Sequence, residues 1–152
     1  MKSNLRLIGG KKLQSPNNAY TRPTTMRVRE AIFNILKNRV ENSNWLDLFS
    51  GTGTISCEAY NHGAKKIIAI EKNKNNSKIC LKNLLSLDDV ENRKNDIDVI
   101  CKDVLNWTKP NYDRNLSSKI MDLNKLKFDF VYLDPPYDVN FHELVLNQIF
   151  NC

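Results

Sequence analysis

The sequence has no apolar run long enough to cross a membrane, no C-x-x-C pair, and no apolar region behind its first residues of the kind that marks a signal peptide. A membrane span needs roughly 20 consecutive apolar residues, and a signal peptide needs an apolar core. The four cysteines, Cys57, Cys80, Cys101 and Cys152, are scattered. This spacing argues against a zinc site and favours reduced, structural thiols. We therefore expect a cytoplasmic protein that holds no metal.

The composition is that of one folded domain with a basic arm. The chain has 152 residues, 41% of them hydrophobic and 26% charged, which is enough to bury a core. The net charge of +6 is uneven: residues 1–45 carry nine basic and two acidic side chains, a net +7, so the remainder sums to −1. Such asymmetry suggests contact with a polyanion. A solvated basic surface is the alternative.

The most unusual stretch is Leu133-Asp-Pro-Pro-Tyr137, which follows an apolar run. Pro135 and Pro136 cannot donate to a sheet ladder, so they end the predicted strand and stiffen the turn. Asp134 and the neighbouring carbonyl groups then point at a fixed place, and Tyr137 offers a flat face for stacking. This pattern indicates a pocket for a planar group that bears an amine, such as a nucleobase. A rigid turn in which Tyr137 covers apolar surface is the alternative.

Strands alternate with helices along the chain. The predicted strands are 5–8, 45–49, 66–71, 98–103 and 127–134, and the predicted helices begin at Thr24 or Thr25 and cover 55–61, 73–87 and the amphipathic end of the chain. Residues 109–126 lack periodicity and read as a surface insertion. The alternation predicts an α/β fold with a parallel sheet. Ligands of such sheets bind at the carboxyl ends of the strands, at the topological switch point.

The first long helix combines an apolar face with a basic start. Its predicted inward positions are Val28, Ala31, Ile32, Ile35, Leu36 and Val40. Arg22, Arg27 and Arg29 cluster at its beginning, where positive charge opposes the helix dipole. We interpret these arginines as reserved for phosphate groups, with solvated arginines as the alternative.

A cofactor signal lies in the segment Asp47-Leu-Phe-Ser-Gly-Thr-Gly53, a strand that runs into a glycine turn. Glycines there let a ligand approach the backbone and supply amides at a helix start. The dinucleotide-binding fingerprint requires a third glycine, and Ser56 occupies that position. Glu71 ends the next strand and suits the hydroxyls of a ribose, while Asp103 ends the third strand and suits an adenine amino group. The set predicts an adenosine-containing cofactor.

The charge of these groups narrows the choice of cofactor. Asp47 lies beside the glycine turn and Asp134 lies on the neighbouring strand, and carboxylates suit a ligand that carries positive charge. S-adenosylmethionine, with its sulfonium and ammonium groups, fits better than a pyrophosphate. A nicotinamide-dependent oxidoreductase on a similar sheet is the alternative from a different class, and the missing third glycine argues against it.

Four segments together resemble a known family. They are Arg22-Pro-Thr-Thr-Met-Arg-Val-Arg-Glu-Ala-Ile-Phe-Asn34, the glycine turn, Glu71 and Asp134-Pro-Pro-Tyr137. Their order resembles that of the bacterial 16S rRNA guanine-N2 methyltransferases, which are class I S-adenosylmethionine-dependent enzymes. The likeness covers roughly residues 5–150, and the Arg22–Asn34 block is its most specific part. The Asp-Pro-Pro-Tyr tetrapeptide alone is shared with adenine-N6 DNA and RNA methyltransferases and protein glutamine methyltransferases.

The resemblance implies S-adenosyl-L-methionine as cofactor and N2 of a guanine in 16S rRNA, or in a small-subunit assembly intermediate, as methyl acceptor. It implies that the cofactor is bound by Asp47, Phe49, Gly51, Thr52, Gly53, Glu71 and Asp103. It implies a catalytic turn made of Asp134, Pro135, Pro136 and Tyr137. It implies RNA contacts from Lys11, Lys12, Arg22, Thr24, Arg27 and Arg29. We expect a monomer with no membrane partner.

The resemblance also predicts how the chain is divided. Residues 1–43 would be a basic, RNA-contacting strand-loop-helix extension, and residues 44–152 a Rossmann-like S-adenosylmethionine-binding domain. The family sheet continues for three further strands, so we expect a mostly parallel sheet that lacks them. Met26 stands where the family often has an acid. An adenine-N6 methyltransferase and a catalytically impaired RNA-binding fragment are the remaining alternatives.

Overall fold

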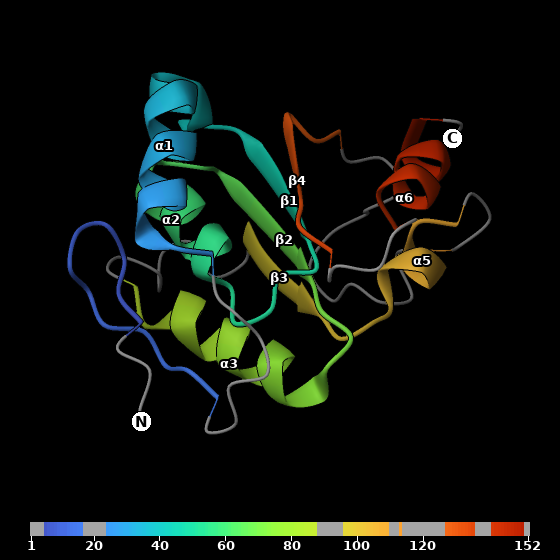
Figure 1. Ribbon diagram of the computed structural model, residues 1–152, viewed down its shortest axis with the longest axis horizontal. Helices are drawn as coiled ribbons and strands as arrows, with labels where there is room; N and C mark the ends of the chain where they lie inside the picture. The colour runs from blue at the N-terminus through green and yellow to red at the C-terminus, as the bar shows by residue number, and fades with distance from the viewer. Residues whose placement is uncertain are drawn as a thin grey trace.

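The computed structural model describes residues 5–16, 24–87, 96–109, 113, 127–135 and 141–150. The elements are α1 (Met26–Leu36), the 3-10 helix η1 (Lys37–Val40), β1 (Asn44–Leu48), α2 (Thr54–Asn61), β2 (Lys66–Ile70), α3 (Lys74–Leu85), β3 (Ile97–Ile100), α5 (Val104–Trp107), β4 (Phe130–Leu133) and α6 (Phe141–Phe150). Four of them form one sheet with the order β3-β2-β1-β4, and helices flank it (Figure 1). The expected α/β fold is confirmed.

The strand order places a switch point between β1 and β4. All three strand pairs are parallel, and their registers set Leu48 opposite Ile70 and Asp47 opposite Tyr132. From β1 the chain moves to β2 and then to β3, whereas β4 lies on the other side of β1. Crevices for ligands open where the order reverses in this way, beyond the carboxyl ends of the strands. The stretches 49–53 and 134–135 follow the two strands that flank this point.

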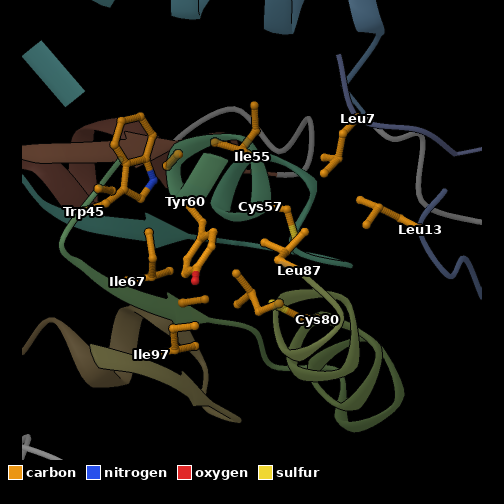
Figure 2. Packing of buried hydrophobic residues seen from close by; sticks show 14 of the residues in the cluster. Leu7, Leu13, Trp45, Ile55, Cys57, Tyr60, Ile67, Cys80, Leu87 and Ile97 are labelled. Atoms are coloured by element: carbon orange, nitrogen blue, oxygen red, sulfur yellow. The ribbon is translucent and has the colours of Figure 1, made fainter. Parts of the chain in front are cut away.

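Two apolar clusters hold helices against the two faces of the sheet. One face packs against α1, α2, α3 and the N-terminal segment (Figure 2); members of its core include Leu7, Leu13, Phe33, Trp45, Cys57, Ile67, Cys80 and Leu84. The other face packs against α5 and α6 through Leu46, Leu48, Ile68, Ile70, Val104, Trp107 and Val145. Alternate residues of β1 therefore enter opposite cores, as expected for a strand buried on both faces.

Three helices begin at side chains that accept backbone N–H groups. Thr25 Oγ1 accepts from Val28 N at 3.4 Å and caps α1, which confirms the predicted helix start. Asn73 caps α3 by accepting from two amides, and Asp103 caps α5. These caps satisfy amides that have no partner within the helix.

The predicted inward positions of α1 and η1 are confirmed for Ile32, Leu36 and Val40 and wrong for Val28, Ala31 and Ile35. Val28 is 47% exposed and Ile35 is 76% exposed, whereas the buried residues of α1 are Arg29 and Phe33. Ile32 and Leu36 do pack against the core. Arg29, whose buried ion pair is described below, lies on the inward side of this helix.

The N-terminal segment is a tight turn and not the predicted strand 5–8. One isolated antiparallel bridge joins Arg6 and Lys12, and Leu13 N donates to Leu5 O at 2.9 Å. Leu5, Leu7 and Leu13 enter the same core as the residues of β1 and α2. The division at residues 43 and 44 therefore stays a prediction about roles, since the packing is continuous across it.

Other boundaries differ slightly from those expected. β3 ends at Ile100, and its last predicted residues lead into the short helix α5, which the sequence did not reveal. Most of the predicted surface insertion 109–126 lies outside the described residues. In the described part of the chain, β4 pairs with β1 alone and its Val131 is 43% exposed.

Candidate functional site

A glycine turn joins β1 to α2 and opens the site. Phe49, Gly51 and Gly53 all have positive φ angles, of 64°, 56° and 77°. Gly53 caps α2, and its N–H donates to Ser50 O at 2.8 Å. A Cβ built on Gly51 would meet nothing within 4 Å, so the backbone there faces open space. A ligand can approach these amides closely, as the sequence predicts.

The two glycines give a matched pair of variants. A Cβ on Gly53 would overlap Cys80 Sγ of α3, whereas one on Gly51 meets open space. Both positions carry the same φ penalty of about 1–2 kcal/mol for a non-glycine residue. Gly53→Ala should therefore destabilise the protein more than Gly51→Ala, because it also pushes α2 from α3. Chemical denaturation measures both; equal losses would contradict the close packing.

Glu71 ties the end of β2 to the glycine turn. Its Oε2 accepts from Gly51 N at 2.9 Å, and its Oε1 accepts from Asn73 N at 2.7 Å. The side chain is 8% exposed, and burial raises the pKa of Glu71 despite these two hydrogen bonds. Each carboxylate oxygen has a second lone pair, so the group can also accept from a ligand hydroxyl.

Asp47 lies deepest in the site. It is 1% exposed, and Ser56 Oγ donates to its Oδ2 at 2.5 Å. Burial raises the pKa of Asp47 to about 7; hydrogen bonds from Ser56 lower it, and the charges of Asp134 and Glu71 raise it further. The charges of Asp134 and Glu71 thus act on Asp47. The parallel registers place Asp47, Glu71 and Asp134 at the same edge of the sheet, within or just after β1, β2 and β4.

The raised pKa of Asp47 predicts a pH dependence of stability. The carboxyl ionises near its ordinary 3.8 when unfolded and near 7 when folded, so between these values the folded protein binds more protons. Stability therefore falls as the pH rises through this window, by about 4 kcal/mol for this group. Asp47→Asn should remove that loss. Urea denaturation of both proteins at pH 5 and pH 8 tests it; parallel pH profiles would contradict the prediction.

Asp134 follows β4 directly and is exposed. Its Oδ2 accepts from Thr24 Oγ1 and from the Tyr132 hydroxyl, each at 3.3 Å. Burial raises the pKa of Tyr132 to about 12, so the phenol stays a donor at neutral pH. Pro135 is buried. The predicted amine-binding carboxylate is therefore held by hydroxyl groups that come from two distant parts of the chain.

Asp103 stands one strand further along the rim. The ladder between β2 and β3 continues past the strands, because Glu71 N donates to Ile100 O and Lys102 N donates to Glu71 O, both at 3.1 Å. Asp103 is half-buried, and its Oδ1 accepts from Asn106 N at 3.3 Å as the cap of α5. The predicted adenine contact is thus adjacent to the predicted ribose contact.

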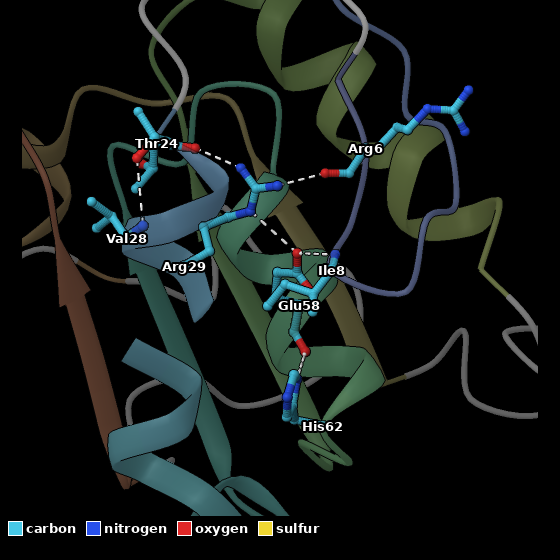
Figure 3. Close-up of polar contacts among 8 residues, drawn as sticks. Arg6, Ile8, Thr24, Val28, Arg29, Glu58 and His62 are labelled. Atoms are coloured by element: carbon cyan, nitrogen blue, oxygen red, sulfur yellow. Dashed lines mark hydrogen bonds and ion pairs between the residues drawn. The ribbon is translucent and has the colours of Figure 1, made fainter. Parts of the chain in front are cut away.

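Arg29 is not a free arginine, and its predicted contact with RNA is wrong (Figure 3). It is 2% exposed, and its Nε lies 3.2 Å from Oε1 of the buried Glu58. Its Nη1 and Nη2 donate to Thr24 O and Arg6 O, each at 2.5 Å. Glu58 Oε1 also accepts from Ile8 N. A buried guanidinium with these partners is a structural centre that joins α1, α2 and the N-terminal segment.

Asn83 makes a second link that sequence reasoning missed. This α3 residue is 1% exposed; its Nδ2 donates to Thr52 O at 2.9 Å and to Gln14 O at 3.0 Å, and its Oδ1 accepts from Gln14 N at 2.8 Å. One amide thus holds the glycine turn and the N-terminal segment together. No motif marks it, since α3 also contains Asn75 and Asn76.

The remaining predicted site residues fall into two groups. Arg22, Pro136 and Tyr137 lie outside the described residues. Lys12 and Arg27 are exposed, Lys11 is half-buried, and Thr52 is buried.

Within the residues that the structure covers, no group of three His, Cys, Asp or Glu side chains is arranged to hold a metal ion. No helix among them has the length and apolar character of a membrane span.

Comparisons with known proteins agree with this geometry. A family model described as Conserved hypothetical protein 95 matches residues 5–151. The Haemophilus influenzae protein named Ribosomal RNA small subunit methyltransferase D is 31% identical over 152 residues, which cover 97% of this chain and 72% of that protein. The chain belongs to this methyltransferase family. A relative of the same name from Buchnera aphidicola is 26% identical, with 95% of this chain and 66% of the relative covered.

Solved structures of methyltransferase folds match the family assignment. "Putative methyltransferase yhhF from Escherichia coli" aligns with a TM-score of 0.76 at 26% identity and covers 97% of this chain and 72% of that one. SMU.776, "a putative methyltransferase complexed with SAH", aligns with a TM-score of 0.63 at 19% identity, over 91% of this chain and 35% of that one. The second likeness concerns the fold alone. The predicted class I methyltransferase architecture is thus confirmed for this chain.

Proposed function

We propose that this chain transfers a methyl group from S-adenosylmethionine to the exocyclic N2 of a guanine in 16S rRNA. The observation that carries the proposal is the meeting of Asp47, Glu71 and Asp134 at the switch point, beside an open glycine turn. The names of the curated relatives support rRNA of the small subunit as the substrate.

The site fits the cofactor in charge and in shape. Asp47 is a buried carboxylate whose ionised form burial disfavours, with two further carboxylates nearby; a sulfonium and an ammonium group would complement this negative field. Open space in front of Gly51 admits the ligand. We assign Glu71 to the ribose hydroxyls and Asp103 to the adenine amino group. We assign contacts with the methionine end of the cofactor to the segment that contains Asp47, Phe49, Gly51, Thr52 and Gly53.

The bound cofactor supplies an electrophilic methyl group; the chain's own residues prepare the acceptor. The lone pair of a guanine amine is delocalised into the ring, so the nitrogen is a weak nucleophile. Asp134 and the Pro135 carbonyl accept hydrogen bonds from its two N–H groups and localise the lone pair, and Tyr137 stacks on the base. As the N–C bond forms and the S–C bond breaks, the methylated nitrogen loses one proton, which passes to the Asp134 carboxylate. Positioning of the two reactants contributes about 7–11 kcal/mol at best. Pro136 stiffens the turn that carries these groups.

We infer that the basic N-terminal extension holds the RNA backbone through Lys11, Lys12, Arg22 and Arg27. The double reversal Lys12→Glu/Arg27→Glu should weaken RNA binding and leave S-adenosylhomocysteine binding unchanged. Each lost phosphate contact should reduce the slope of log K against log salt by about 0.7–0.9. Lys78→Glu, an exposed reversal on α3, is the control. An unchanged slope in the double variant would contradict a role of the N-terminal extension in RNA binding.

The proposed reaction is tested by product analysis. The full chain is incubated with small-subunit RNA, or with the assembling particle, and with labelled S-adenosylmethionine, and the RNA is digested to nucleosides for mass analysis. N2-methylguanosine is the expected product. N6-methyladenosine would replace guanine by adenine as the substrate, and the absence of any methylated nucleoside would overturn the proposal.

A further inference from the structure

The hydroxyl of Thr24 reaches the catalytic turn from the other end of the chain. Thr24 Oγ1 donates to Asp134 Oδ2 at 3.3 Å, across 110 residues of sequence. The Tyr132 hydroxyl donates to the same oxygen at 3.3 Å. Two donors on one oxygen fix the carboxylate plane. Within the described part of the chain no hydrogen bond reaches Oδ1 of Asp134, which leaves this oxygen for a further donor.

Thr24 is itself held by a buried structure. Its carbonyl oxygen accepts from Arg29 Nη1, and Arg29 is paired with Glu58 inside the molecule (Figure 3). The next residue, Thr25, caps α1. The carbonyl group of Thr24 and the residue that follows it are therefore both held, and the half-buried side chain of Thr24 reaches Asp134 from a position just before α1. Sites carried by such supports are positioned more accurately than sites on free loops.

We propose that Thr24 is a positioning residue that, together with Tyr132, holds Asp134 Oδ2 so that Oδ1 receives the substrate amine. This inference rests on the proposed function and deepens it. It changes the role that the family resemblance implies for Thr24, from an RNA contact to a support of the catalytic carboxylate. The Arg29–Glu58 pair then acts on the reaction through Thr24, because it fixes the backbone from which the hydroxyl projects.

The test separates positioning from RNA binding by kinetics. Thr24→Val keeps the side-chain shape and removes the hydroxyl. It should lower kcat for methyl transfer by about 2- to 10-fold, the worth of one hydrogen bond, and leave the KM for RNA and the affinity for S-adenosylhomocysteine unchanged. Thr24→Ser should restore kcat, Tyr132→Phe should give a fall of similar size, and the double variant should be slower than either single variant.

Ser43→Ala is the control, since it removes a buried hydroxyl that donates to Val40 O just before β1 begins, at the end of that strand opposite the site; it should lower the melting temperature while kcat stays near that of the wild type. An unchanged kcat in Thr24→Val, or a raised KM for RNA with kcat intact, would overturn the positioning role while wild-type transfer still supports the proposed function. A wild-type chain that methylates no guanine would overturn both.

Discussion

Replacing Asp134 by alanine should lower kcat for methyl transfer by about 100- to 1,000-fold, the loss expected when one preorganised polar group at the reacting centre is removed. The carboxylate is exposed at the end of β4 and is held by two hydroxyl groups. It is thus available to a substrate amine and already oriented. Alanine removes the acceptor, and the lone pair of the amine then stays in the ring.

The control for Asp134→Ala is Glu30→Ala, the loss of an exposed carboxylate on α1. This variant should methylate RNA at the wild-type rate. Calorimetric titration with S-adenosylhomocysteine should give similar affinities for Asp134→Ala and the wild type, because the proposed cofactor contacts lie on β1, β2 and β3. Near-normal turnover in Asp134→Ala with intact cofactor binding would remove the carboxylate from the mechanism.

Glu58→Gln should destabilise the protein by about 3–5 kcal/mol, because it leaves the Arg29 guanidinium charged and unpaired inside the molecule. The two side chains are 3% and 1% exposed and lie 3.2 Å apart. For a domain of this size, that loss corresponds to a fall in melting temperature of roughly 6–20 °C. Differential scanning calorimetry measures it directly.

Two further variants serve as comparisons for Glu58→Gln. Arg27→Met changes an exposed arginine on the same helix and should alter stability by less than about 0.5 kcal/mol. Arg29→Met/Glu58→Gln removes the buried charge as well as its partner, so the double variant should lose less stability than the sum of its single variants. Additive losses would mean that the two residues act independently, which contradicts a buried ion pair.

The site was predictable because its signals are local. Three short patterns each predict a local backbone feature. They are a glycine turn after a strand, an acid at the end of the next strand, and Asp-Pro-Pro after a later strand. Parallel strands then bring these ends to one edge, whatever the loops between them do. That is why Gly51, Glu71 and Asp134 could be expected together from the sequence. In the structure Gly51 donates to Glu71, and Asp134 follows β4, which pairs with β1.

The role of Arg29 was not predictable for the opposite reason. Its partner Glu58 lies 29 residues away on another helix, and no spacing rule connects them. Helical periodicity placed Val28 and Ile35 inside because it counts apolar residues, whereas in the structure these two side chains are exposed and Arg29 is buried. The cluster of arginines at the helix start indicated phosphate binding. This interpretation suits the exposed Arg27 better than the buried Arg29.

The short helix α5 and the link through Asn83 show the same limit. α5 has only four residues, too few for a periodic pattern. Asn83 bridges Gln14 and Thr52 by tertiary contacts alone. Both N-terminal links, through Glu58 and through Asn83, end at α2 or at the glycine turn. The basic extension is thus built into the site, and RNA held by it would be fixed relative to the cofactor.

In the proposed site, side chains from separate strands hold both an adenosine cofactor and a flat amine. A crystal structure of the chain with S-adenosylhomocysteine would locate the cofactor. We expect ribose hydroxyls hydrogen-bonded to Glu71, adenine beside Asp103, and the sulfur atom directed toward Asp134. The ligand bound at another face of the sheet, or with its sulfur directed away from Asp134, would contradict the proposed site.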